Sequence, residues 1–411
     1  MATATQPVTF KAILRQGPFR RLWIAQFVSV FGDFLALFGV ISLITFRMHG
    51  TALQVTAASI AFALPIAIIG PPAGVFVDRW NVKRLMIASD LLRAVLILAL
   101  VFVRDVRGIC VIFVLLSAVS SFFAPAQTVT LRTLVPVEGL MAANALMSQT
   151  IYLVRILAPS LAGSLILFLG VNACFYLDSL SFLFSAAMLS TLVILRPGTS
   201  NRANTLKGFA GDLLAGNKFI FTHSGLSFVF MAMAVAMFVL SSFSPLISIY
   251  IRDFLRAGTF LFGVISSMVG IGMILGTQAV TRVARNRAPT TVVLGGLLGL
   301  GIGVAVLGIS KNVLMAAAST FTMGFSIALV LVPAQTMSQR ETPPDMIGRV
   351  SSSFMSLIFQ AQILGLLLSG FLAQIMGIRT LFVSSAALLA VISGAGYLWV
   401  RDKNPAAPAA G

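Results

Sequence analysis

The chain has 411 residues and a net charge of +17, yet only 9% of its residues are charged and 58% are apolar. Soluble proteins carry about 25% charged residues, so this composition excludes an ordinary soluble domain and indicates an integral membrane protein. Most of the 28 Lys and Arg lie in the tails and in alternate connections between apolar runs. The positive charge therefore indicates membrane topology, not nucleic-acid binding.

Apolar runs follow one another along the whole chain, and each is long enough to cross a bilayer, which takes roughly 20 residues of helix. Backbone groups inside lipid must form hydrogen bonds within their own segment, so these runs are predicted to be helices. The sequence predicts an all-α integral membrane protein with 12 transmembrane helices, at 22–46, 53–77, 85–103, 108–131, 141–168, 171–195, 226–251, 260–284, 291–310, 312–337, 350–375 and 380–400.

Lys and Arg are concentrated in the two tails and in the connections that follow even-numbered spans. Loops rich in positive charge stay on the cytoplasmic side of the membrane, and an even number of spans places both termini on the same side. We expect a multi-pass protein of the cytoplasmic (inner) membrane with both termini in the cytoplasm.

Asp33 stands near the middle of the first predicted span. An ionised carboxyl in hydrocarbon is costly, so it usually faces a partner or a water-filled cavity. Asp33 is either a site that couples transport to protons or binds a cationic substrate, or an acid that pairs with Arg155 or bonds to neighbouring helices for assembly.

A short charged hinge joins the second and third spans, with Asp78 next to Arg79 and Lys83 next to Arg84. Together with Gly74, these residues resemble the signature loop between helices 2 and 3 of the major facilitator superfamily of transporters. The resemblance implies the fold of that superfamily, two pseudo-symmetric six-helix bundles. It also implies that the loop latches a cytoplasmic gate.

Asp90 and Arg93 are three residues apart in the third span, so they lie on one face of a helix. This spacing favours an internal ion pair over a substrate site. With the charged residues of the preceding hinge, the pair is expected to form part of the cytoplasmic gate.

Arg155, in the middle of the fifth span, is the cation placed deepest in the predicted membrane. A guanidinium keeps its proton in proteins, so it needs an acid or an anionic cargo. We expect either an ion pair with Asp33 or Asp178, or direct contact with an anionic substrate. Asp178, in the sixth span, is the second candidate for proton coupling.

Pro159 and Gly163 follow in a stretch that resembles the span-5 antiporter motif of facilitator-type exporters, with alanines in place of two glycines. Small residues let helices approach closely and proline bends a helix, so these two residues are expected to serve helix packing. Further polar residues that could contact substrate are Gln149, Gln360 and Gln362.

The two halves of the chain repeat. The sequence Pro-Ala-Gln-Thr at 125–128 recurs at 333–336, and Arg132 matches Arg340 at the same offset of 208 residues. The repeat predicts one six-helix bundle in 1–195 and a second in 223–411, joined by a cytoplasmic linker at 196–222 with an amphipathic later part. Rocking of paired bundles would open a central cavity to each side in turn.

Three segments, 19–23, 134–144 and 176–182, resemble the bacterial macrolide and enterobactin exporters of this superfamily. This resemblance implies a multidrug-type efflux antiporter, which exports amphipathic small molecules (drug, macrolide or siderophore) in exchange for protons. One alternative is a translocator of lysophospholipid or a lipid-like anion, with Arg155 at the headgroup. Another is a membrane sensor or scaffold that does not transport.

The sequence contains no Walker lysine motif, no nucleophile elbow and no His-Glu zinc helix, which are the patterns of ATP hydrolysis and of common hydrolytic enzymes. We therefore expect no enzyme activity, no cofactor and no metal site. The expected partners are a small-molecule substrate, protons and the lipid bilayer, with the protein as a monomer.

Overall fold

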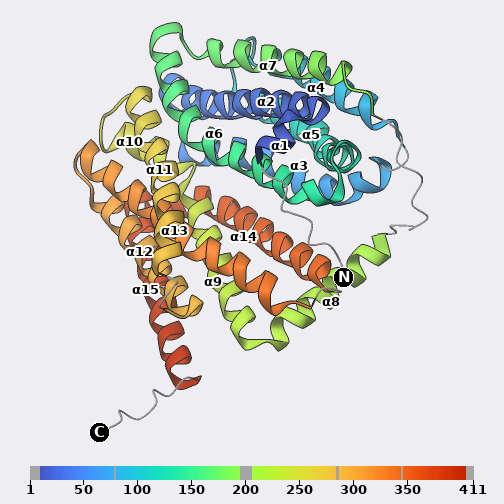
Figure 1. Cartoon of the computed structure of the whole chain (residues 1–411). Coiled ribbons are helices and arrows are strands. Elements are labelled where there is room, and N and C mark those ends of the chain that lie inside the picture. Colours follow the sequence, from blue (N-terminus) through green and yellow to red (C-terminus); the bar gives the residue numbers. More distant parts are fainter. Residues whose placement is uncertain (1–9, 78–79, 195–205, 284–286, 344–345, 404–411) are drawn as a thin grey trace, which may run out of the picture. The chain divides into compact units, whose positions relative to one another are not determined.

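A computed structural model describes residues 10–77, 80–194, 206–283, 287–343 and 346–403. Every regular element in these ranges is a helix (Figure 1). The chain divides into two compact units: unit 1 contains residues 1–49 and 57–206, and unit 2 contains residues 50–56 and 207–411. The division after Leu206 falls inside the segment predicted as a linker.

Unit 1 consists of seven α-helices and two short turns of other helix types, apart from the first turn of α3, which groups with unit 2. The helices are α1 (Phe10–Arg15), α2 (Gly17–Ser42), α3 (Ala52–Val77), α4 (Val82–Ala99), α5 (Val106–Leu134), α6 (Leu140–Leu169) and α7 (Asn172–Ser190); a π-helical turn, η1 (Leu43–Arg47), ends α2, and a 3₁₀ turn, η2 (Val137–Gly139), precedes α6.

Unit 2 consists of the remaining helices. They are α8 (Leu206–Thr222), α9 (Ser224–Phe243), α10 (Leu246–Asp253), α11 (Thr259–Val283), α12 (Pro289–Ile309), α13 (Val313–Glu341), α14 (Ile347–Met376) and α15 (Ile378–Lys403).

Within the described residues, 11 helices are long and apolar enough to cross a membrane. The third predicted span corresponds to α4, whose 18 residues include Lys83, Arg84, Asp90 and Arg93. These charges lower its apolar character, and α4 instead buries one face against α5 and α7. The predicted all-α membrane fold is confirmed.

The seventh predicted span is divided in two. α9 ends at Phe243 and α10 begins at Leu246, with Pro245 between them. Proline lacks the N–H that a helix needs and its ring clashes with the preceding turn. The prediction of one continuous helix over 226–251 was therefore wrong at this point.

The two units repeat the same succession of helices. Five helices of unit 1 and their counterparts in unit 2 begin 207 residues apart: Gly17 and Ser224, Ala52 and Thr259, Val82 and Pro289, Val106 and Val313, Leu140 and Ile347. Gly170 and Gly377, at the same offset, both have a positive φ, 82° and 80°, at the end of a 30-residue helix. The helix bounds thus establish a structural repeat across most of each unit.

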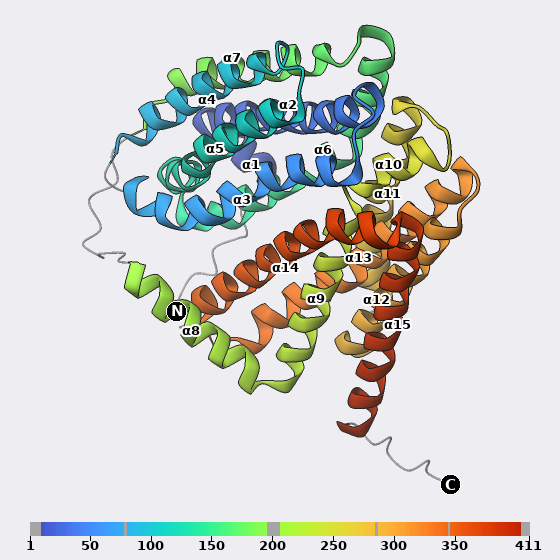
Figure 2. The ribbon, with the colours of Figure 1, turned by 180° about the vertical axis from the view of Figure 1, so that it is seen from behind.

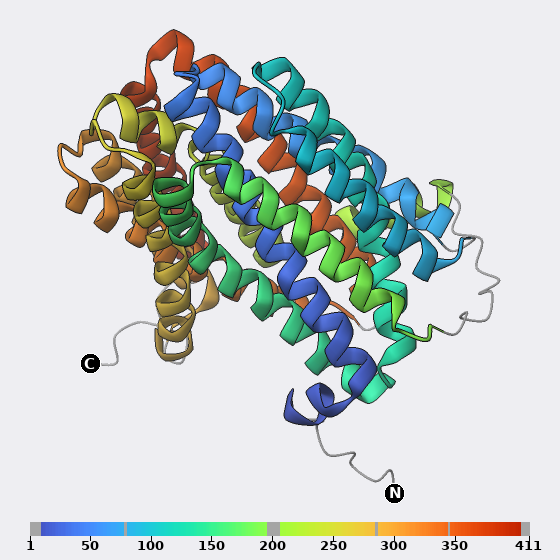
Figure 3. The same ribbon diagram turned by 90° about the horizontal axis from the view of Figure 1, so that it is seen from above.

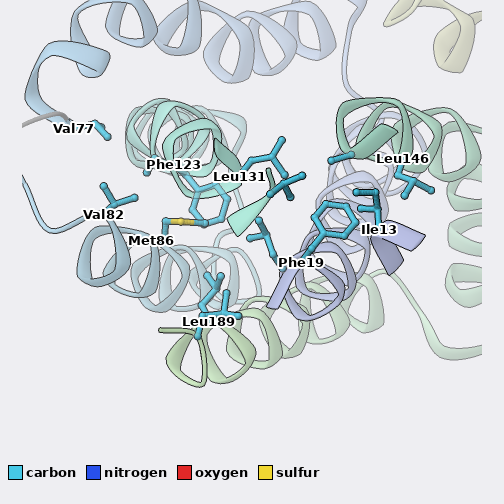
Figure 4. Packing of buried hydrophobic residues seen from close by; sticks show 14 of the residues in the cluster. Ile13, Phe19, Val77, Val82, Met86, Phe123, Leu131, Leu146 and Leu189 are labelled. Carbon is cyan, nitrogen blue, oxygen red and sulfur yellow. The ribbon is translucent and has the colours of Figure 1, made fainter. Parts of the chain in front are cut away.

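A hydrophobic cluster at one end of unit 1 anchors the hinge between α3 and α4 (Figure 4). Val77, the last residue of α3, and Val82, the first of α4, are both buried in it. Leu189 and Leu192, at the end of α7, belong to the same cluster. The two ends of the hinge and the end of α7 are therefore held by one core.

In unit 2, α8 packs closely on the start of α14 (Figure 2). Ser353 Oγ of α14 donates a hydrogen bond of 3.1 Å to the main-chain oxygen of Leu213 in α8. A Cβ at Gly216 would overlap the main chain of Arg349. The segment predicted to be an amphipathic surface helix is a helix, and one side of it is held by α14.

Close packing of α11 on α13 depends on residues without side chains. A Cβ added at Gly324 of α13 would overlap the main-chain carbonyl of Val269 in α11, and one at Gly272 of α11 would overlap that of Phe321 in α13. Small residues let membrane helices approach until their backbones touch, and these glycines do so from both sides of the contact.

We expect Gly324→Ala to destabilise unit 2 by about 1–3 kcal/mol, because overpacking forces backbone shifts of this cost. The measurement is the melting temperature of the detergent-solubilised protein. Gly295→Ala is the matched control, because this helical glycine of α12 is exposed and has no neighbour within 4 Å of the added carbon. Equal melting temperatures for the two variants would contradict the packing role.

Candidate functional site

A cluster of charged side chains lies inside unit 1. It comprises Asp33 on α2, Asp90 and Arg93 on α4, and Asp178 on α7, here called the charged cluster. α7 packs against both α2 and α4, and the three helices run side by side (Figure 3). The Ser179 hydroxyl also joins α7 to α4 by a 3.1 Å hydrogen bond to the Ala94 carbonyl.

Arg93 is the centre of the cluster, and its side chain is only 4% exposed. Its Nη2 donates to Oδ1 of Asp90, as the spacing in sequence predicted. Its Nη1 lies 4.0 Å from Oδ2 of Asp33. The guanidinium carbon lies over the rings of Phe123 on α5 and Phe182 on α7, 4.4 Å from each centroid, an arrangement that favours a cation electrostatically.

Asp178 is fully buried and faces α2. The Ser181 hydroxyl donates a 3.2 Å hydrogen bond to its Oδ1. Gly32, next to Asp33, leaves room for this carboxyl: a Cβ there would overlap both Asp178 Oδ1 and Ser181 Oγ. The missing side chain at position 32 thus allows a second acid to approach the one on α2.

The charges of the cluster do not balance, because three carboxyls surround one guanidinium. The three acids and Arg93 are close enough to interact electrostatically. Burying charge away from water is costly unless it is neutralised by a partner or a proton. Asp33 is 25% exposed, whereas Asp90 and Asp178 are fully buried, so Asp33 is the most accessible acid of the cluster.

The charged side chains of the cluster are not repeated at the corresponding helix positions of unit 2. Counted from the helix starts, which are 207 residues apart, Leu240, Leu297 and Leu300 of unit 2 correspond to Asp33, Asp90 and Arg93. Leu297 and Leu300 are fully buried in α12. The buried positions of α12 that correspond to Asp90 and Arg93 of α4 are therefore apolar.

The cation beside Asp33 is not the one expected. The sequence suggested that Arg155 either pairs with Asp33 or Asp178 or contacts an anionic substrate, and the structure shows Arg93 next to Asp33. Arg155 is exposed on α6. Periodicity could not reveal this, because it does not fix how each helix is rotated towards its neighbours.

The other candidate residues are placed as follows. Gln149 is exposed on α6 of unit 1, whereas Gln360 and Gln362 lie on α14 of unit 2. The amide of Gln360 donates to Ser356 Oγ at 3.1 Å, one turn away. Pro159 lies inside α6, which continues through it, and Gly163 is buried on the same helix.

The hinge between α3 and α4 is described in part. Gly74 lies in α3, and Asp78 and Arg79 lie outside the described residues. Lys83 Nζ donates to the main-chain oxygens of Ser190 and Leu192, at 2.6 and 2.7 Å. A cation at these last carbonyls satisfies the end of α7 and complements its dipole. Lys83 thus connects the hinge to the helix that carries Asp178.

Sequence reasoning missed four contributors to the site: Gly32, Phe123, Ser181 and Phe182. Ser181 and Phe182 follow Asp178 by three and four residues, and this spacing could have placed them on the same face of the helix. Phe123 carried no such signal, because an aromatic ring in a membrane span is ordinarily explained by contact with lipid or core.

Charged groups buried among membrane helices are typical of proteins that move ions or solutes. The charged cluster therefore indicates a membrane transport protein. The sequence pattern of the Major Facilitator Superfamily matches residues 22–362. The chain therefore belongs to the major facilitator superfamily and is a multi-pass membrane transporter.

The chain is 30% identical to the MFS-type transporter YfiS of Bacillus subtilis over 383 residues, which are 90% of each protein. It is 23% identical to macrolide efflux protein A of Streptococcus pyogenes, over 91% of this chain and 94% of that protein. It is 24% identical to the multidrug efflux pump Tap of Mycolicibacterium fortuitum, over 82% of this chain and 84% of that protein.

Solved structures share the fold at low sequence identity. A bacterial homologue of the human lysosomal transporter Spinster, in an inward-facing conformation, is 13% identical with a TM-score of 0.73, over 96% of this chain and all of that one. A variant of the nucleoside transporter NupG is 12% identical with a TM-score of 0.74, over 93% and 99%. These similarities establish the fold alone.

We expect Lys83→Gln to lower the stability of unit 1 by about 1–2 kcal/mol, because a hydrogen-bonded cation at a helix end contributes this much. Arg84→Gln removes the same charge from the next residue, whose side chain is exposed, and is expected to stay within about 0.5 kcal/mol of wild type. Thermal melting in detergent measures both. If the two variants have the same melting temperature, the hydrogen bonds of Lys83 to the end of α7 do not stabilise unit 1.

Proposed function

We propose that the protein is a proton-coupled exporter of amphipathic small molecules, of drug, macrolide or siderophore type, which works by alternating access. The observation that carries this proposal is the charged cluster of unit 1, with three acids around one guanidinium. The named functions of two relatives, macrolide efflux and multidrug efflux, support the cargo class.

The chemistry of the cluster supports proton coupling. Arg93 cannot act as the exchanging group, because a guanidinium stays protonated. The exchange therefore takes place at a carboxyl, and Asp33 is the only acid of the cluster with substantial exposure. A proton or a cationic cargo at Asp33 would relieve the excess negative charge, which is the property that an antiporter needs.

The structural repeat also supports a location of proton coupling in unit 1. Unit 2 places leucines where unit 1 has Asp33, Asp90 and Arg93. Replacing buried ion pairs by apolar residues is often neutral or stabilising, so charges kept in one unit only are better explained by function than by folding. We assign coupling to unit 1.

Orientation and direction belong to the proposal as well. The distribution of Lys and Arg supports a location of both termini in the cytoplasm, and we propose that the protein acts as a monomer in the inner membrane. Cargo then leaves the cytoplasm as protons enter, so the pH gradient across that membrane drives export.

The test uses liposomes that contain the purified protein under an imposed pH gradient. Proton flux is recorded on adding macrolides, cationic dyes, siderophores or lysophospholipids in turn. We expect at least one macrolide, dye or siderophore to trigger flux in wild type, and Asp33→Asn to abolish it, because the amide cannot exchange a proton.

Asp253→Asn is the matched control. It also replaces an acid by its amide, but Asp253 is exposed in unit 2 and paired with the adjacent Arg252, and exposed pairs contribute little. It is expected to transport like wild type. A response to lysophospholipid alone would favour a lipid translocator, and binding without any flux would favour a sensor; either result would refute the exporter.

A further inference from the structure

Arg93 makes a close contact with Asp90 and a longer one with Asp33. Asp90 is fully buried and its Oδ1 accepts directly from Nη2. Asp33 is 25% exposed, and its Oδ2 stands 4.0 Å from Nη1, at the limit of an ion pair. Arg93 therefore has one tightly held acid and one loosely held acid, and the loosely held one is the acid that can meet solutes.

The surroundings of Arg93 hold it in place. The rings of Phe123 and Phe182 lie on the guanidinium at 4.4 Å, so the cation is restrained by α5 and α7 while its nitrogens meet the carboxyls. Among the described residues, Nε of Arg93 has no hydrogen-bond partner. The guanidinium therefore has an N–H group that neither of the two acids accepts from.

Resting on the proposed proton coupling, we infer that Asp90 and Arg93 are positioning residues that set the protonation of Asp33. Asp90 occupies the guanidinium permanently, so that the contact of Arg93 with Asp33 is weak enough to break in every cycle. Protonation of Asp33, or arrival of a cationic cargo there, releases Nη1 without leaving Arg93 unpaired in the membrane. A sole ion pair between Asp33 and Arg93 would instead hold the acid ionised.

Other charged groups are few on the elements that pack against α2. α7 contributes Asp178, which faces Gly32 beside Asp33, and α6 carries Arg155 on an exposed position. The remaining charges on these elements and on α2 itself stand at or near helix ends: Lys11 and Arg15 of α1, Arg20 and Arg21 of α2, Arg47 of η1, Arg107 and Arg132 of α5. Arg93 is therefore the cation that acts on Asp33.

The experiment measures how coupled transport depends on pH in two variants that should move it in opposite directions. In Asp90→Asn, the guanidinium loses its tightly held acid and Asp33 loses a repelling one, so ionised Asp33 is stabilised. We expect the pH midpoint of transport to move about one unit towards acid. In Arg93→Gln, ionised Asp33 loses its counter-charge, and we expect a shift of about one unit towards alkaline pH.

A double variant, Asp90→Leu with Arg93→Leu, separates this effect from folding. It copies Leu297 and Leu300, which fill the corresponding places in unit 2, and its melting temperature reports whether α4 still packs. Asp33 again lacks its counter-charge but also loses the repelling charge of Asp90, so the midpoint should move to alkaline pH by less than in Arg93→Gln. A purely structural role of the pair would lower the melting temperature and leave the midpoint unchanged.

Infrared difference spectroscopy of the Asp33 carboxyl band, identified by its loss in Asp33→Asn, gives the same titration in variants that do not transport. Opposite shifts in the two single variants support the inference. Shifts in the same direction, or none, overturn it even if wild type exports drugs with protons. Absence of drug-driven flux in wild type would refute the exporter, while the infrared titration still decides the role of Arg93.

Discussion

The burial of Arg93 among membrane helices is the constraint on which the rest of unit 1 depends. A guanidinium cannot be neutralised in place, so the fold has to supply counter-charge and contact from several sides. α4 supplies Asp90, α2 supplies Asp33, and α5 and α7 supply the rings of Phe123 and Phe182. The same charges make α4 too polar to be recognised as a span by composition, so this helix is stable in its place because its neighbours enclose its charged face.

The structural repeat separates what the fold needs from what the function needs. Corresponding helices of the two units begin 207 residues apart, yet the places of Asp90 and Arg93 are taken by Leu297 and Leu300 in unit 2. Buried ion pairs seldom stabilise a protein more than well-packed apolar residues do. Unit 2 therefore fills these two places with apolar residues, whereas unit 1 buries an ion pair there.

The spans could be predicted within a few residues, because the thickness of the bilayer fixes the length of an apolar run directly. The break at Pro245 and the short helix α1 were not foreseen. α1 lies in a mostly polar tail, and among the residues of this helix only Ile13 is buried. Within the candidate site, Asp90 and Arg93 could be paired, since both stand on one helix. The contact of Asp33 with Arg93 could not, because it depends on how α2 and α4 are rotated around their axes, and helices that are apolar on all sides carry little periodic signal of rotation.

The hinge and the charged cluster, which are separate features of the sequence, are joined through α7. Lys83 donates to the main-chain oxygens of Ser190, the last residue of α7, and of Leu192 just beyond it. Leu189 belongs to the same hydrophobic cluster as Val77 and Val82. Towards its other end, α7 places Phe182 on Arg93 and Asp178 against Gly32. An α-helix is stiff along its axis because each turn is hydrogen-bonded to the next, so a displacement of its end at the hinge also displaces the ring and the carboxyl.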